Sequence, residues 1–99
     1  MTLSEAFDTI EQYSQEGERA GTCLFRYGRL LIDRGGIQRG LDCCPVCGQY
    51  HGMGWIFVTH DDGRRIGIHL PLYHYAKAGH PISETDIDAE LLFAIIADA

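Results

Sequence analysis

The sequence predicts an α+β fold in which a small antiparallel sheet lies between an N-terminal and a C-terminal helix, with a cysteine knuckle in the middle of the chain. Three observations favour this class. Apolar residues recur at helical spacing near both ends, they alternate on either side of an Asp-Gly turn, and three of the four cysteines fall within residues 43–47. The 99 residues leave room for little more than one domain, which we predict over residues 1–99.

The first helix is predicted over residues 3–16. Thr2, followed three residues later by Glu5, is the pattern of a capping box, and Gly17 provides an end to the helix. One face of this helix is apolar and consists of Leu3, Ala6, Phe7, Ile10 and Tyr13.

Strand-forming residues fill the segment 22–32. Gly28 in its middle predicts either two short strands or one bent strand, and a turn is expected over residues 33–36. A further short strand is predicted over residues 37–42.

A hairpin is the clearest element of the second half. Strands are predicted over residues 55–59 and 65–70, and the turn between them contains an Asp-Gly pair. In this register residue 55 lies opposite residue 69, and Pro71 ends the second strand. A short helical turn is expected over residues 72–78, before a break at residues 79–81.

A last helix is predicted near the C-terminus, capped by Ser83 with Asp86 or by Thr85 with Asp88. Its apolar stripe consists of Ile87, Leu91, Leu92, Ile95 and Ile96. Acidic residues gather in its first turns, where they favour the helix dipole, namely Glu84, Asp86, Asp88 and Glu90.

Acidic residues outnumber basic ones by 14 to 8, and the formal net charge is −6. This balance argues against a general nucleic-acid coat protein, which is typically strongly basic. No apolar run approaches the roughly 20 residues needed to span a bilayer, and the first residues lack the basic and apolar regions of a secretory signal. We therefore expect a cytoplasmic protein whose thiols stay reduced.

The sequence Cys-Pro-Val-Cys-Gly at residues 44–48 carries the strongest chemical signal. Two residues separate Cys44 from Cys47, and this spacing lets two thiolates reach one tetrahedral ion. Pro45 stiffens the turn, and Gly48 accommodates a positive φ. These five residues resemble the metal knuckles of zinc-ribbon and related zinc-finger proteins, and the resemblance implies structural zinc.

The remaining ligands are chosen by proximity, because the second Cys-x-x-Cys of a zinc ribbon is absent from the sequence. His51 follows Cys47 by four residues, and the hairpin register returns His69 to the end of the knuckle. The predicted ligands are therefore Cys44, Cys47, His51 and His69, with His74, Cys23 and Cys43 as substitutes in that order. His60 and His80 are interpreted as exposed loop residues.

The cysteines have alternative uses. The thiols can be ordinary buried groups without zinc, or Cys23 can form a disulfide with Cys43. The Cys-Pro-Val-Cys pattern is similar to the glutaredoxin active site, but three glycines follow it, so no helix begins there to lower the thiol pKa. The zinc deaminase and metalloprotease motifs are absent, which argues against an enzyme.

Two surfaces are candidates for partner binding. Arginines and aromatic residues alternate in the centre of the chain, which is mildly basic, and the acidic last helix offers a surface complementary to a basic protein. The candidate partner-binding residues are Arg26, Arg29, Arg64, Arg65, Trp55, Glu84, Asp86 and Asp88.

We expect a non-catalytic regulatory or inhibitory protein with structural zinc that binds a protein partner. In size and charge it is similar to the small acidic phage inhibitors of host defence, which act on complexes that handle nucleic acid. A nucleic-acid-binding module that uses the arginines and aromatic rings is the alternative. Phe93 and Ala94 lie beside the main apolar stripe of the last helix, and this surplus suggests a homodimer.

Overall fold

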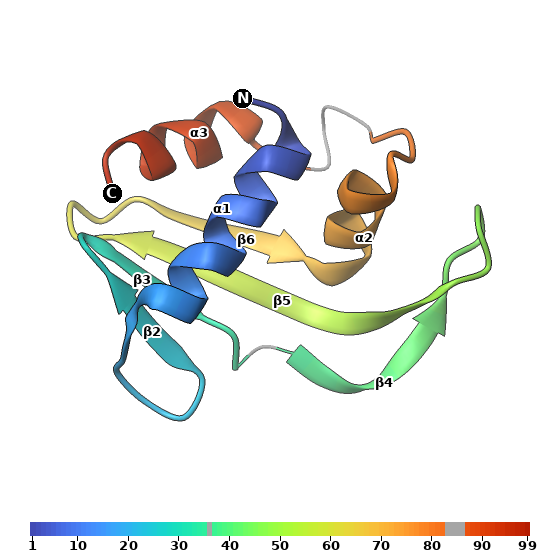
Figure 1. Ribbon diagram of the computed structural model, residues 1–99, viewed down its shortest axis with the longest axis horizontal. Coiled ribbons are helices and arrows are strands. Elements are labelled where there is room, and N and C mark those ends of the chain that lie inside the picture. The colour runs from blue at the N-terminus through green and yellow to red at the C-terminus, as the bar shows by residue number, and fades with distance from the viewer. Residues whose placement is uncertain (36, 83–86) are drawn as a thin grey trace.

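The structure, a computed structural model, describes residues 1–35, 37–82 and 87–99, and only the backbone course of residues 37–42. Its helices are α1 (Leu3–Glu16), α2 (Leu70–Ala78) and α3 (Ala89–Ala97). Its strands are β1 (Glu18–Arg19), β2 (Leu24–Tyr27), β3 (Leu30–Asp33), β4 (Ile37–Cys43), β5 (Tyr50–His60) and β6 (Arg65–His69). An antiparallel sheet with helices near both ends of the chain confirms the predicted α+β class (Figure 1).

The long strand β5 organises the sheet. Its residues 57–60 pair with β3 along one edge, and its residues 55–59 pair with β6 along the other. Its residues 50–54 pair with β4, which follows β3 along the same edge (Figure 1). β2 extends the sheet beyond β3, and β1 extends it beyond β2. The predicted hairpin register is confirmed, since Trp55 lies opposite His69.

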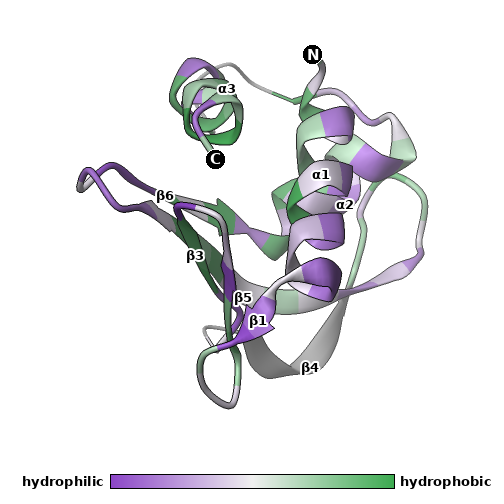
Figure 2. Cartoon of the chain, turned by 60° about the vertical axis from the view of Figure 1, so that its left-hand side comes forward, coloured by the Kyte–Doolittle hydropathy of each residue, from purple (hydrophilic) through white to green (hydrophobic). Residues whose placement is uncertain are grey.

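The helices lie on one face of the sheet and enclose the core (Figure 2). Strand residues alternate between the two faces, so Ile56, Val58, Ile66 and Ile68 are buried beneath the helices. The helices and the segment before α3 add Ala6, Phe7, Ile10, Leu72, Ala76, Ile87, Leu92, Ile95 and Ile96 to the core. Within the described residues, no helix covers the opposite face.

α1 begins and ends where the sequence predicts. The Glu5 N–H donates to Thr2 Oγ1 over 3.2 Å, and the Thr2 N–H donates to Glu5 Oε1 over 3.0 Å, which completes the capping box. The helix is fixed to its neighbours by stacked rings, because Phe7 lies 5.0 Å from Tyr73 and Tyr13 lies 3.9 Å from Tyr27, centroid to centroid.

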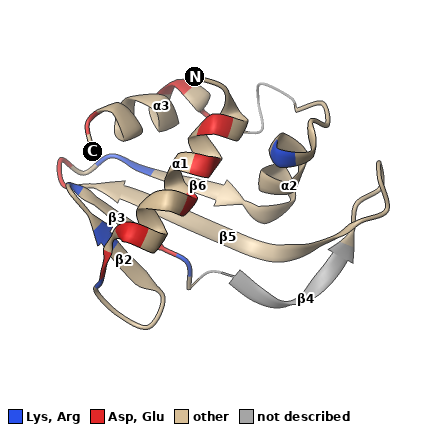
Figure 3. Cartoon of the chain, in the orientation of Figure 1, with Lys and Arg blue, Asp and Glu red and all other residues tan. Residues whose placement is uncertain are grey.

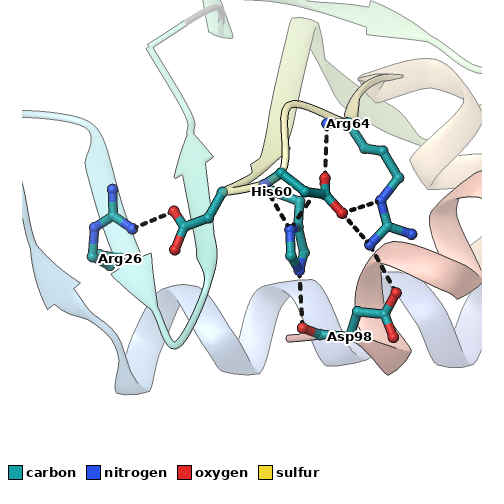
Figure 4. Close-up of polar contacts among 6 residues, drawn as sticks. Arg26, His60, Arg64 and Asp98 are labelled. Atoms are coloured by element: carbon teal, nitrogen blue, oxygen red, sulfur yellow. Dashed lines mark hydrogen bonds and ion pairs between the residues drawn. The ribbon is translucent and has the colours of Figure 1, made fainter.

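The β5–β6 turn is tied to the C-terminal end of α3 (Figure 4). The interpretation of His60 as an exposed loop residue is wrong, because it ends β5 and only 5% of it is exposed. Its Nδ1 accepts the Asp62 N–H over 3.1 Å, so Nε2 carries the proton that it donates to the Asp98 carbonyl over 2.9 Å. Arg64 bonds both Asp62 and the Asp98 carboxylate, and its hydrogen bonds lower the pKa of Asp62 to about 2.

Other elements also differ from expectation. The helical turn expected over residues 72–78 is the nine-residue α2, with Pro71 in its first turn, where a missing N–H costs nothing. α3 begins at Ala89, and its N-cap is Asp88, whose carboxylate accepts the Leu91 N–H over 3.0 Å. The caps predicted at Ser83 and Thr85 lie outside the described residues. The short strand β1 was not predicted.

None of the helices in the described ranges is long and apolar enough to cross a membrane.

We predict that Tyr73→Phe lowers the free energy of unfolding by about 1 kcal/mol. The Tyr73 hydroxyl donates to Glu11 Oε2 over 2.7 Å and joins α2 to α1. Burial and this carboxylate raise the pKa of Tyr73, so the stabilisation is present below the ordinary tyrosine pKa of about 10 and is lost as the pH rises through the folded-state pKa.

Urea unfolding of the wild type and Tyr73→Phe between pH 7 and pH 10.5 measures this difference. It should be largest at pH 7 and should narrow above about pH 10. Tyr75→Phe is the matched control in the same helix, because no hydrogen bond of the Tyr75 hydroxyl is found among the described residues. Equal losses in the two variants would contradict the proposed role of the Glu11 bond.

Candidate metal centre

Residues 43–49 form a tight knuckle between β4 and β5. The Cys44 N–H donates to the Gln49 carbonyl over 2.8 Å, and the Gly48 N–H returns to the Cys44 carbonyl over 2.9 Å. Gly48 has a φ of 73°, in the left-handed region where glycine is favoured. The loop thereby turns Cys44 inward, where 1% of it is exposed, while Cys47 stays near the surface.

The C-terminal end of α2 brings two histidines beside the knuckle. His74 lies in the helix, and the helix ends in a Schellman motif at Gly79, whose φ is 77°. The Gly79 N–H bonds the Ala76 carbonyl, and the His80 N–H bonds the Tyr75 carbonyl over 2.8 Å. This reversal folds His80 back over the last turn, so that its ring centroid lies 5.5 Å from that of His74.

Four ligand atoms converge at this point. One donor atom from each of Cys44, Cys47, His74 and His80 lies within 4.8 Å of every other. Cys47 Sγ is 3.5 Å from His74 Nε2. His80 Nε2 is buried and has no hydrogen-bond partner among the described residues, which is costly for a polar atom. Two sulfurs and two imidazoles in this arrangement could hold a metal ion.

The surroundings of Cys44 and His74 favour the protonation states in which these side chains bind a metal. Burial raises the pKa of the Cys44 thiol, but the N–H groups of Cys47 and Val46 and the Cys47 thiol bond its sulfur and leave the pKa lowered overall. Burial and the neighbouring rings of His51 and His80 lower the pKa of His74. A thiolate and a neutral imidazole are the forms that bind a metal.

The group contains both predicted cysteines and the substitute His74, but neither His51 nor His69. His51 lies behind His74, with ring centroids 5.2 Å apart, and its Nδ1 is 3.0 Å from the Gly52 carbonyl oxygen. His69 alternates with the buried Ile68, so its side chain is exposed, and its ring stacks on Trp55 with the ring centroids 4.6 Å apart.

His80 is half-buried, so its interpretation as an exposed loop residue is wrong, and it was not among the predicted ligands. The signal was Gly79, because a glycine after a helix predicts a Schellman motif that returns the following residues to the last turn.

The other two cysteines are outside the group. Cys43 is exposed, and its Sγ lies 3.3 Å from the Gly48 carbonyl oxygen. Cys23 is exposed in the loop between β1 and β2. No disulfide joins any of the four cysteines, all of which the structure describes.

Acidic side chains are gathered on α1 and α3, and the β5–β6 turn carries both acidic and basic ones (Figure 3). Three of the candidate partner-binding arginines have identified contacts within the chain. Arg26 pairs with Asp61 at 3.1 Å, and Arg64 bonds both Asp62 and Asp98. Arg65 lies over the Phe57 ring at 4.3 Å, whereas Arg29 is exposed in the β2–β3 turn.

The candidate partner-binding acids give little support for a partner surface on α3. Asp88 caps α3, and this role explains its carboxylate without the need for a binding partner. Glu84 and Asp86 lie outside the described residues.

Exposed apolar side chains follow the knuckle and β5. Among the described residues, four of the five large exposed ones fall within ten positions, the fifth being Met1. We call these four the apolar stripe, and they are Val46, Tyr50, Met53 and Trp55. Tyr50 is the most exposed at 72%, and Trp55 is 43% exposed.

In comparisons with known proteins, no family model, no curated protein and no solved structure matches this chain.

Proposed function

We propose that this chain is a small non-catalytic zinc protein, in which a structural ion holds the knuckle against α2. The observation that supports it best is the convergence of Cys44, Cys47, His74 and His80 around the partnerless His80 Nε2. Two thiolates and two imidazoles form a typical structural zinc set. Four protein ligands leave no open position for a substrate, and the set contains no carboxylate to serve as a base.

The spacing of the donors suits zinc. Zinc–sulfur bonds near 2.3 Å and zinc–nitrogen bonds near 2.0–2.1 Å place tetrahedral donors about 3.4–3.8 Å apart. The 3.5 Å between Cys47 Sγ and His74 Nε2 already lies in this range. The whole group, within 4.8 Å, would close by about an ångström around the ion.

A bound zinc ion would add to the folding stability of a chain of this size. A small domain buries only about 60–65% of the surface that its unfolded chain exposes, so its margin of stability is narrow. The ligands are brought together only by folding, so the free energy of metal binding becomes free energy of folding. Thiolate ligands need a reducing compartment, which is why we propose the cytoplasm.

We predict one zinc ion per chain and a melting temperature that falls by roughly 10 °C or more when a strong chelator is added. His80→Ala should weaken zinc binding by about a hundredfold or more, because it removes a ligand. His69→Ala is the matched control, because His69 is exposed and lies outside the group of four donors.

Metal analysis, competition with a chromophoric chelator and melting curves measure these effects. Cobalt substitution adds a spectroscopic test, since a tetrahedral site with two thiolates gives intense visible bands. A folded chain without metal, or equal zinc loss in His69→Ala and His80→Ala, would contradict the assignment.

We infer that the apolar stripe binds a protein partner, on which the chain acts as a regulator or inhibitor. Tryptophan, tyrosine and methionine are enriched at the centres of protein interfaces, and exposed apolar groups of this size cluster where a partner covers them. Arg26 and Arg64 are paired with carboxylates of the chain itself, which leaves fewer cations for a nucleic-acid backbone.

We predict that the double variant Tyr50→Ser, Trp55→Ser loses its protein partner in pull-downs while keeping its zinc. Removing two interface anchors typically costs several kcal/mol of binding free energy. Gln15→Ala, an exposed change on α1, is the matched control and should keep the partner.

Three outcomes separate the alternatives. Capture that survives nuclease treatment and is lost only in the double variant supports the proposal. Capture that nuclease abolishes and Arg65→Ala weakens would instead indicate the nucleic-acid-binding module. Sedimentation that shows a dimer, lost in the double variant, would make a second copy of this chain the partner.

A further inference from the structure

A pocket lies where the β1–β2 loop meets the end of β3, in a part of the fold that contains none of the four candidate metal ligands. Its volume is about 460 Å³, within the range of small-molecule sites. Its lining is formed by Arg19, Thr22, Cys23, Phe25, Arg34 and Gly35. Two arginines thus line one pocket in a chain whose net charge is −6.

Neither of these two arginines forms an ion pair within the part of the chain that the structure describes, although the charge of Arg34 acts on Tyr73. Arg26, Arg64 and Lys77 all form ion pairs, whereas none with the described carboxylates is formed by Arg19, Arg29, Arg34 or Arg65. Of these four, Arg19 and Arg34 line the same pocket. A pair of arginines left without carboxylates in an acidic chain favours an external anion.

Carboxylates on adjoining elements have other partners. The Gly35 N–H donates to Asp33 Oδ1 over 2.8 Å, and the Tyr73 hydroxyl donates to Glu11 Oε2 over 2.7 Å. Arg19 is held instead by a ring, since its Cζ lies 5.9 Å from the centroid of Phe25. The guanidinium is therefore positioned at the pocket wall and keeps its hydrogen-bond donors.

We propose that this pocket binds the phosphate group of a small molecule. Arginine presents paired N–H donors that match phosphate oxygens, and two arginines balance the two charges of a phosphate monoester. The Thr22 hydroxyl adds a donor, and the Phe25 ring provides an apolar wall for the remainder of the ligand. Inorganic phosphate and a nucleotide are the two sources of this chemistry.

Calorimetric titration of the zinc-loaded protein with inorganic phosphate, AMP and adenosine tests the proposal. Phosphate and AMP should bind and compete with each other, and binding should weaken as the salt concentration rises. Adenosine, which lacks the phosphate, should not bind. AMP that binds more tightly than phosphate would identify the nucleotide as the source, and equal affinities would identify free phosphate.

Arg19→Ala and Arg34→Ala should each lower the affinity at least tenfold, whereas Arg34→Lys should lose less because it keeps the charge but not the fork. Arg29→Ala is the matched control, because Arg29 is exposed in the turn at the other end of β2 and β3. Unchanged zinc content and melting temperature would show that the variants fold.

Cys23 gives a readout in the wild-type protein. Its exposed thiol lines the pocket, so phosphate or AMP should slow its alkylation, measured by mass spectrometry, while adenosine should not. Cys43, which is exposed at the knuckle, should react at the same rate throughout. Absence of binding by both phosphate and AMP, or an affinity unchanged in Arg19→Ala and Arg34→Ala, would overturn the proposal without affecting the zinc site.

Discussion

The structure depends on the way in which one strand, β5, pairs along its whole length. Its hairpin half is flanked by β3 and β6 and buries Ile56, Val58 and His60 beneath the helices. Its knuckle half pairs with β4 and buries His51. The inward-facing positions are two residues apart in the rest of the strand, but His51 and Gly54 are three residues apart. Gly54, with a φ of 101°, permits this change of face, since such a backbone conformation is rarely open to other residues. The same change leaves Tyr50 exposed.

The change of face explains why the knuckle meets α2 and not the uncovered side of the sheet. A strictly alternating strand would place Gly52 inward and His51 outward. With His51 inward, the knuckle end of the ribbon lies against the helical layer, where Cys44 is buried and His51 packs on His74. The Schellman turn at Gly79 then supplies the fourth donor. The metal group therefore combines two local turns, each specified by a glycine, with one tertiary contact between them.

Local features of this protein could be predicted from its sequence, and long-range ones could not. The capping box at Thr2 and the register that sets Trp55 opposite His69 depend on residues close in the chain, and both are confirmed. The bounds of β5 were too short because Gly52 and Gly54 weaken strand propensity, whereas pairing with β4 overrides it. Cys44 and Cys47 could be placed by their spacing. For His80 only the turn at Gly79 could be predicted, because the burial of its ring beside the cysteines depends on where α2 packs against the sheet.

Two of the proposals are physically linked, and the third is separate. The apolar stripe and the two cysteines occupy the same ribbon, so a zinc ion that fixes the knuckle to α2 also orders the surface offered to a partner. Ordering a surface in advance removes part of the entropic cost of association, so the proposed zinc and protein partner would each raise affinity for the other. The pocket of Arg19 and Arg34 shares no residue with the stripe or the metal group. Its occupancy is expected to have little effect on zinc affinity, since coupling requires an element whose state both sites bias.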